Sequence, residues 1–215
     1  MNAFHKLKFM LYTLKVREFF MFHVVDEFEN NIAGFYNAAF AIATDSCTHA
    51  IELCLRYKQF EGITVPNRTY ISVAFLPVKL KLRWSWNIEE WNNYYYLGNT
   101  NIIDAAVYWK QGGYVPGSFM CLSFQFQKHL SLGRGGMILC DDETSFRELK
   151  KMSYDGRDPN IPWREQNIDS IGYHYYMTPE LAQIGINKLE KVKNKIPRKW
   201  KWNDWPDLST MDVFK

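Results

Sequence analysis

The sequence predicts an α/β protein built in three layers, with a mostly parallel sheet between helices on both faces. Short apolar runs of strand length alternate along the chain with segments of helical period, which is typical of this class. The clearest example is the apolar run at 38–44, after which Ala50, Leu53, Cys54 and Tyr57 recur at helical spacing. A chain of 215 residues is long enough to bury a sizeable core as one domain.

The first half of the chain is predicted to begin with an amphipathic helix at 24–36, where apolar residues recur with helical period. Beyond the strand at 38–44 and the helix that follows it, residues 63–65 and 70–75 are expected to be strands or buried segments. Residues 78–96 mix Lys and Arg with Trp and show no clear period, so the sequence assigns them no element. A covering flap is one interpretation of that stretch.

The second half of the chain is predicted to hold three buried strands and two helices, separated by a long polar loop. In chain order they are strands at 101–103, 118–123 and 137–140, a helix at 144–152, a loop at 153–171 and a helix that begins at Thr178 and Pro179.

Three parts of the chain are expected: an N-terminal arm at 1–24, a large domain at 25–196 and a Trp-rich tail at 197–215. The arm has no small-residue cleavage site, so a signal peptide is not expected. A surface-seeking amphipathic helix, an added arm and an alternative start at Met10 or Met21 all stay open. The tail is expected to pack on the body of the protein or on a partner subunit.

Charge and cysteine content narrow the class of protein. The net charge of +3 is too small to indicate a nucleic-acid partner, and no segment is long enough to span a membrane. The cysteines lie in apolar surroundings without paired metal-ligand spacing, so we expect reduced, buried thiols, no metal site and a cytoplasmic protein. These cysteines are Cys47, Cys54, Cys121 and Cys140.

The most informative stretch surrounds Lys128. Ser123 precedes this lysine by five positions, a Gly-x-Gly-Gly turn follows at 133–136, and upstream Asp104 ends a short apolar run. A lysine can bond an aldehyde, an aspartate can pair with a ring nitrogen, and a hydroxyl can bind a phosphate. These are the groups needed to hold pyridoxal 5'-phosphate.

A second candidate region is the polar turn after the strand at 38–44. Ser46 and Thr48 can cap the next helix, and a strand, a polar turn and a helix in this order point backbone N–H groups at a phosphate. By itself the turn is more typical of an ordinary capped helix, and Lys128 and Asp104 downstream favour the phosphate site instead. Ser46, Asp104 and Ser123 each follow a predicted strand, and ligands of such sheets bind beyond the carboxyl ends of strands.

Together these residues resemble the DegT/DnrJ/StrS family of sugar aminotransferases, a branch of the fold-type I pyridoxal phosphate enzymes. The blocks that match in order are 25–50, 65–71, 103–106 with the Lys128 stretch, and 172–177 with the helix after it. The resemblance covers roughly residues 25–195 and implies a truncated large domain without most of the small C-terminal domain. In its shortness the chain resembles the compact versions of the family from marine phage genomes, which implies a phage origin.

The resemblance implies that Lys128 and Asp104 are catalytic. Lys128 would bond the cofactor aldehyde and later move a proton as general base, while Asp104 would lie against the pyridine nitrogen. Further cofactor contacts are implied at Ser46, Cys47, Thr48, Tyr70, Ser123 and His174. Tyr70 would stack on the pyridine ring, with a core aromatic as the alternative, and His174 would reach the phosphate from a neighbouring subunit, which implies a homodimer.

The implied function is transamination of a keto sugar, expected to be nucleotide-linked, in amino-sugar or surface-glycan biosynthesis. A sugar, an amino donor and a second subunit are therefore the expected partners, with no nucleic acid and no membrane. Cys47, Val107 and Tyr176 depart from the family pattern and motivate an alternative, a protein that binds the cofactor without transaminase activity. A non-catalytic interaction protein with a Trp-rich surface is the other alternative.

Overall fold

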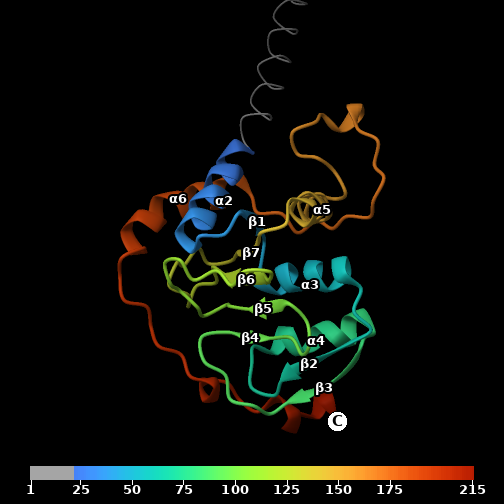
Figure 1. Ribbon diagram of the computed structural model, residues 1–215, viewed down its shortest axis with the longest axis vertical. Helices are drawn as coiled ribbons and strands as arrows, with labels where there is room; N and C mark the ends of the chain where they lie inside the picture. Colours follow the sequence, from blue (N-terminus) through green and yellow to red (C-terminus); the bar gives the residue numbers. More distant parts are fainter. Residues whose placement is uncertain (1–21) are drawn as a thin grey trace, which may run out of the picture.

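In the computed structural model, residues 22–215 are described, so the predicted arm at 1–24 lies almost entirely outside the described residues. A five-stranded sheet lies between two sets of helices (Figure 1). The sheet has the order β1 (Phe40–Thr44), β7 (Gly136–Cys140), β6 (Phe119–Ser123), β5 (Ile102–Asp104) and β4 (Tyr95–Tyr96).

The helices divide between the two faces of this sheet. One face is covered by α2 (His23–Tyr36) and α6 (Pro179–Val192), which pack on each other. The other face is covered by α3 (Cys47–Lys58) and α5 (Glu143–Ser153), and α4 (Ile71–Leu80) packs on the outer side of α3 (Figure 1). Two further strands, β2 (Gly62–Pro66) and β3 (Arg83–Asn87), pair in parallel as a separate small sheet beside α4.

The predicted α/β class and the helices on both faces are confirmed, but the sheet is mixed rather than mostly parallel. Strand β7 is antiparallel to both of its neighbours, β4 is antiparallel to β5, and only β5 and β6 pair in parallel within this sheet among the described residues. Apolar runs do not encode strand direction, so the pattern could not reveal the reversal of β7. Strands β1, β5 and β6 nevertheless run in one direction, because β1 and β6 are both antiparallel to β7.

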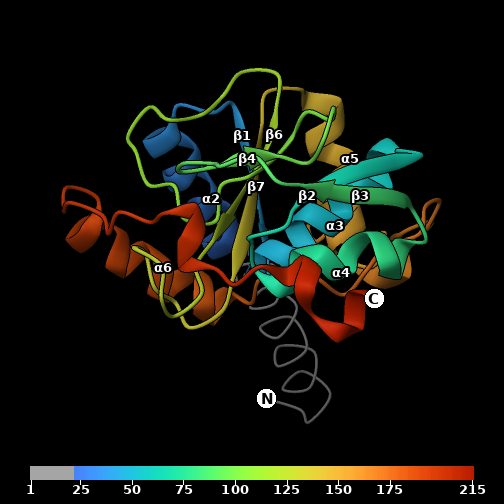
Figure 2. The ribbon, with the colours of Figure 1, turned by 90° about the horizontal axis from the view of Figure 1, so that it is seen from below.

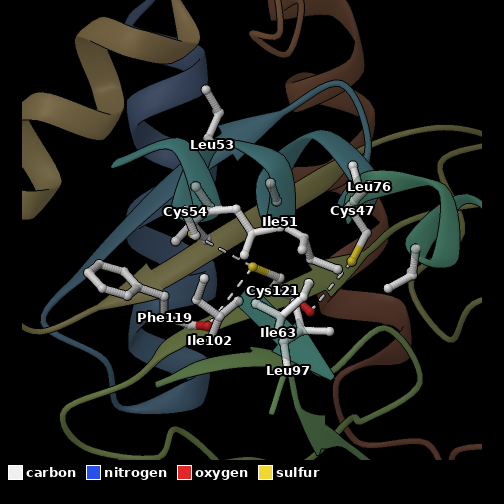
Figure 3. Packing of buried hydrophobic residues seen from close by; sticks show 14 of the residues in the cluster. Cys47, Ile51, Leu53, Cys54, Ile63, Leu76, Leu97, Ile102, Phe119 and Cys121 are labelled. Atoms are coloured by element: carbon white, nitrogen blue, oxygen red, sulfur yellow. Dashed lines mark hydrogen bonds between the residues drawn. The ribbon is translucent and has the colours of Figure 1, made fainter. Parts of the chain in front are cut away.

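Alternation along the strands produces the two cores of this three-layer arrangement. In β1, Ile42 packs into the cluster under α3, whereas Ala41 and Ala43 pack into the cluster under α2 and α6. Figure 3 shows the α3 side, where Cys54 and Cys121 lie among Ile51, Leu53 and other aliphatic side chains. All four cysteines are buried free thiols, as predicted.

Two stretches of the first half differ from the sequence prediction. In the segment 70–75, expected to be a strand or a buried segment, Tyr70 is the N-cap of helix α4 and the rest belongs to that helix. Residues 78–96, which had no assignment, contain the end of α4, then β3, the buried Trp91 and β4. A short apolar run cannot be identified as helix or strand from its period alone, and Pro77 inside α4 gave a further signal against a helix. The other predicted helices and strands are present, with boundaries shifted by a few residues.

The tail packs on the body of the protein, which confirms one of the two predicted arrangements. It passes from the α6 side across to α4 (Figure 2) through the 3₁₀ turns η2 (Trp202–Asp204), η3 (Leu208–Thr210) and η4 (Asp212–Phe214). Leu208 is fully buried, and the ring of Phe214 stacks on Phe75 of α4 at 5.3 Å between centroids. None of the helices within 22–215 has the length and apolar character needed to cross a bilayer.

Candidate active site

A cavity of about 740 Å³ lies at the carboxyl ends of β1, β5 and β6. These strands share one direction, so the polar residues that end or follow them meet at the same edge of the sheet. Seven of the eight predicted site residues line this cavity: Ser46, Cys47, Thr48, Tyr70, Asp104, Ser123 and Lys128. Segments far apart in the sequence therefore come together at the carboxyl ends of these strands, as the sequence predicted.

His174 is the predicted residue that the structure places elsewhere. Its side chain is 72% exposed, and its Nδ1 atom lies 3.1 Å from Oδ2 of Asp155. Tyr176, one of the residues that depart from the expected pattern, packs its ring against His174 and Tyr154. A role for His174 in the site of a neighbouring subunit stays a prediction.

Lys128 lies in the connection from β6 to β7, where its backbone N–H donates to the carbonyl oxygen of Gln125 at 2.9 Å. Burial lowers the pKa of the Lys128 ammonium, and the negative charge of Asp104 opposes that shift only in part. No carboxylate within residues 22–215 forms an ion pair with its Nζ, which instead lies 5.0 Å from the ring centroid of Trp200. A larger share of this amine is thus neutral, the form that attacks a carbonyl.

Asp104 ends β5 and is 4% exposed. Its Oδ1 accepts a hydrogen bond from the N–H of Ala106 at 2.9 Å, and its Oδ2 accepts one from the Tyr95 hydroxyl at 2.5 Å. The Tyr95 oxygen lies 2.5 Å from Oγ1 of Thr69. Because the Tyr95 hydroxyl donates to Asp104, the Thr69 hydroxyl donates to the Tyr95 oxygen. Burial raises the pKa of Asp104, while the bonds from Tyr95 and Ala106 lower it. Neither Tyr95 nor Thr69 was predicted from the sequence, because no local pattern links them to Asp104.

The amino end of α3 forms another part of the cavity wall. Ser46 is the N-cap, and its Oγ accepts a hydrogen bond from the N–H of His49 at 3.2 Å. The Thr48 hydroxyl lies 2.6 Å from the hydroxyl of Ser72, a cavity residue that sequence patterns missed because 70–75 was not expected to be helical. Free N–H groups and two hydroxyls here suit an anionic group such as a phosphate.

Cys47 takes the place of a family glycine without backbone strain. It begins α3 and is not among the residues with positive φ, and its thiol points into the core, 3.6 Å from the carbonyl oxygen of Cys121. The glycine that this turn does require is Gly136, because a Cβ there would collide with the backbone of Ser46 and Cys47. Val107, another departure, lines a smaller cavity of about 160 Å³ that also touches Lys128.

The residues present fit a phosphate-bearing aromatic aldehyde. A half-buried amine with a lowered pKa and a buried, hydrogen-bonded carboxyl group line the same cavity as a helix amino terminus with neighbouring hydroxyls. Tyr70, which is 54% exposed, lies in this cavity and not in the core. The described residues hold no cluster of His, Cys, Asp or Glu suited to a metal ion.

Comparison with known proteins places the chain in one family of aminotransferases. The model of the DegT/DnrJ/EryC1/StrS aminotransferase family matches residues 6–80 and 107–204. The GDP-perosamine synthase of Caulobacter vibrioides is 30% identical over 87 residues, 40% of this chain and 23% of that protein. The GDP-perosamine synthase of Escherichia coli O157:H7 is 33% identical over 91 residues, 41% of this chain and 24% of that protein. The matched region thus spans about a quarter of these relatives.

A solved structure supports the same assignment at the level of the fold. The sugar aminotransferase CalS13 from Micromonospora echinospora superposes with a TM-score of 0.68 at 13% sequence identity, over 79% of this chain and 60% of that chain. The family match covers most of the chain, including Lys128 and the amino end of α3. The chain therefore belongs to the DegT/DnrJ/EryC1/StrS aminotransferase family.

Proposed function

We propose that this protein binds pyridoxal 5'-phosphate and transfers an amino group from an amino donor to a keto sugar linked to a nucleotide. The main support for the proposal is that the half-buried Lys128 and the buried Asp104 line one cavity with the amino end of α3. The names of the two GDP-perosamine synthases support a nucleotide-linked sugar as the substrate class.

Each part of the cavity has one task in holding the cofactor. Lys128 Nζ would bond its aldehyde carbon, Asp104 would face its ring nitrogen, and Tyr70 would lie against the ring. The N–H groups at the start of α3, with the hydroxyls of Thr48 and Ser123, would bind its phosphate. When bound, the cofactor supplies an electron sink that stabilises negative charge on the substrate carbon.

The chain itself supplies the proton transfers. Because burial lowers the pKa of Lys128, more of its Nζ is neutral and can take a proton from the substrate carbon and later return it. Asp104, held by Tyr95 and Ala106, keeps a fixed carboxyl group against the ring nitrogen. We also propose that residues 25–196 form the cofactor-binding unit of a cytoplasmic homodimer, in which the partner's copy of residue 174 completes the phosphate site.

A first experiment compares visible absorbance after addition of pyridoxal 5'-phosphate to the wild type, Lys128→Ala and Lys191→Ala. Lys191 is an exposed lysine in the last turn of α6 and serves as the matched control. The wild type and Lys191→Ala should retain a protein-bound visible band after gel filtration, and Lys128→Ala should lose it. Identical spectra for all three proteins would refute the proposal.

A second experiment separates transamination from cofactor binding alone. Glutamate and other amino donors are added to the wild type carrying the cofactor, and loss of the visible band is followed before a keto sugar nucleotide is supplied. Bleaching by a donor and recovery with the keto sugar would support the transferase. A stable band that no donor alters would instead favour a protein that binds the cofactor without transaminase activity.

A further inference from the structure

The tail forms part of the wall of the large cavity. Its lining residues are two indoles, one carboxylate and several apolar side chains: Trp200, Trp205, Asp204, Pro206, Leu208 and Met211. None of them has a task in holding the cofactor as proposed above. They face the same space as Lys128, so they are available to contact the second ligand of the site.

This wall is fixed to the body of the protein before any ligand binds. The backbone N–H of Leu208 donates to the carbonyl oxygen of Asn67 at 2.8 Å, and Leu208 itself is fully buried. Arg68 Nη1 donates to the carbonyl oxygen of Trp205 at 2.8 Å. Both anchors lie in the segment between β2 and α4, so the tail surface is preformed and little order is lost on binding.

Trp200 is the tail residue whose ring lies beside the reactive amine. Its ring centroid lies 5.0 Å from Lys128 Nζ, and the ring of Trp205 follows at 5.2 Å between centroids. A molecule whose reacting carbon approaches Lys128 therefore comes close to the Trp200 indole, on which the Arg198 guanidinium also packs at 3.8 Å from the ring centroid. Such a molecule meets a broad apolar surface beside the reaction centre.

Polar groups accompany this aromatic surface. Asp204 Oδ2 accepts a hydrogen bond from the N–H of Lys201 at 3.0 Å, which leaves Oδ1 to accept from a ligand. The amides of Gln125 and Gln127 line the same cavity. A pyranose ring has apolar C–H faces and a rim of hydroxyl donors, so it matches indole faces beside carboxylate and amide oxygens. Glutamate, the amino donor of the experiment above, has no comparable apolar face.

We propose that the tail supplies the saccharide-binding surface of this site. The Trp200 indole packs against the C–H face of a pyranose, and the Asp204 carboxylate accepts hydrogen bonds from its hydroxyls. This inference rests on the proposed function, because it takes the keto sugar as the substrate. It assigns recognition of the sugar ring to a segment anchored at Asn67 and Arg68.

The test is calorimetric titration of the cofactor-treated protein with GDP-mannose and, separately, with GDP. Trp200→Ala should weaken binding of GDP-mannose at least about tenfold and leave the affinity for GDP unchanged. Trp200→Phe keeps an aromatic face and should retain most of the affinity. Trp163→Ala removes an exposed indole from a distant loop and should change neither titration. Asp204→Asn keeps an acceptor for the Lys201 N–H and should also weaken the binding that depends on the sugar.

Equal affinities of the wild type and Trp200→Ala for GDP-mannose would overturn the inference, and so would a wild type that binds GDP-mannose no more tightly than GDP. The visible cofactor band is recorded on the same samples as an independent measurement. A wild type without that band would refute the proposed function, whereas the ratio of the two affinities still decides the role of the tail. If Trp200→Ala does not fold, the Trp200→Phe and Asp204→Asn titrations decide instead, and wild-type affinity in Asp204→Asn would overturn the role of that carboxylate.

Discussion

Replacing Tyr95 with Phe removes one hydroxyl from the buried chain of hydrogen bonds that ends at Asp104. In the wild type the Tyr95 hydroxyl donates to Asp104 Oδ2 and accepts from Thr69 Oγ1, both at 2.5 Å. A hydrogen bond to a charged group contributes about 1.5–3 kcal/mol, and one between neutral groups about 0.5–1.5 kcal/mol. The variant should lose about 2–4 kcal/mol of unfolding free energy near neutral pH, since two buried polar groups lose their partner.

The loss of unfolding free energy caused by Tyr95→Phe should also depend on pH. Burial raises the pKa of Asp104 above 3.8, so the folded protein holds a proton that the unfolded chain releases, and stability falls as pH rises through the folded pKa. The hydrogen bond from Tyr95 lowers that pKa, so Asp104 should have a still higher pKa in the Tyr95→Phe variant. The stability of the variant should therefore fall over a wider pH range. We therefore expect a larger loss at about pH 7.5 than at about pH 5, where more of the carboxyl group is protonated.

Urea denaturation at both pH values measures this loss from the transition midpoint at constant slope. The matched control is Tyr96→Phe, because Tyr96 is the next residue, is 42% exposed and should change stability by less than about 0.5 kcal/mol. A Tyr95→Phe variant with an unfolding free energy within about 0.5 kcal/mol of the wild type would contradict this role of the Tyr95 hydroxyl. An equal loss of unfolding free energy at both pH values would contradict it as well.

Four other substitutions have defined outcomes. Gly136→Ala places a Cβ against the start of α3 and should destabilise by about 1–3 kcal/mol in thermal melts, whereas Gly34→Ala, in an open helical position, should stabilise by about 0.5–1 kcal/mol. Lys150→Met leaves the buried carboxylate of Glu29 without its 2.5 Å partner and should cost about 3–5 kcal/mol in urea, less at acidic pH, because loss of the lysine raises the Glu29 pKa further. Unchanged stability in that variant would mean that Glu29 is already protonated. Arg198→Gln removes a positive charge that lowers the pKa of the cavity lysine, so the pH midpoint of cofactor attachment, read by visible absorbance, should rise.

The parts of the site that the sequence predicted are those fixed by local pattern. Ser46 follows an apolar run and precedes a helical period, and Asp104 and Lys128 stand at or beyond the ends of buried strands. Each position is determined by a few neighbours in the chain, so the elements and their polar ends could be placed without a structure. The convergence of these ends follows from the shared direction of their strands.

The parts that were missed depend on contacts between distant segments. The partner of Asp104 is Tyr95, which lies in a stretch without clear period, and the ring above Lys128 belongs to Trp200, in the tail. Helix α4 was missed for a different reason, because its apolar run fits a strand as well as a helix and the contacts with α3 and β2 decide the outcome. Local propensity predicts neither the two side-chain contacts nor the helical state of α4.

The reversal of β7 has a consequence for how the reactive lysine is held. Because β6 and β7 are antiparallel neighbours, the connection at 124–135 leaves and re-enters the sheet at the same edge, and it carries Lys128 across the cavity without a crossover helix. Closing a longer connection costs little, about 0.6 kcal/mol for each doubling of its length. Glycines inserted there would leave the fold nearly as stable but would carry the amine away from Asp104, so the geometry of this site can drift in evolution while the protein still folds.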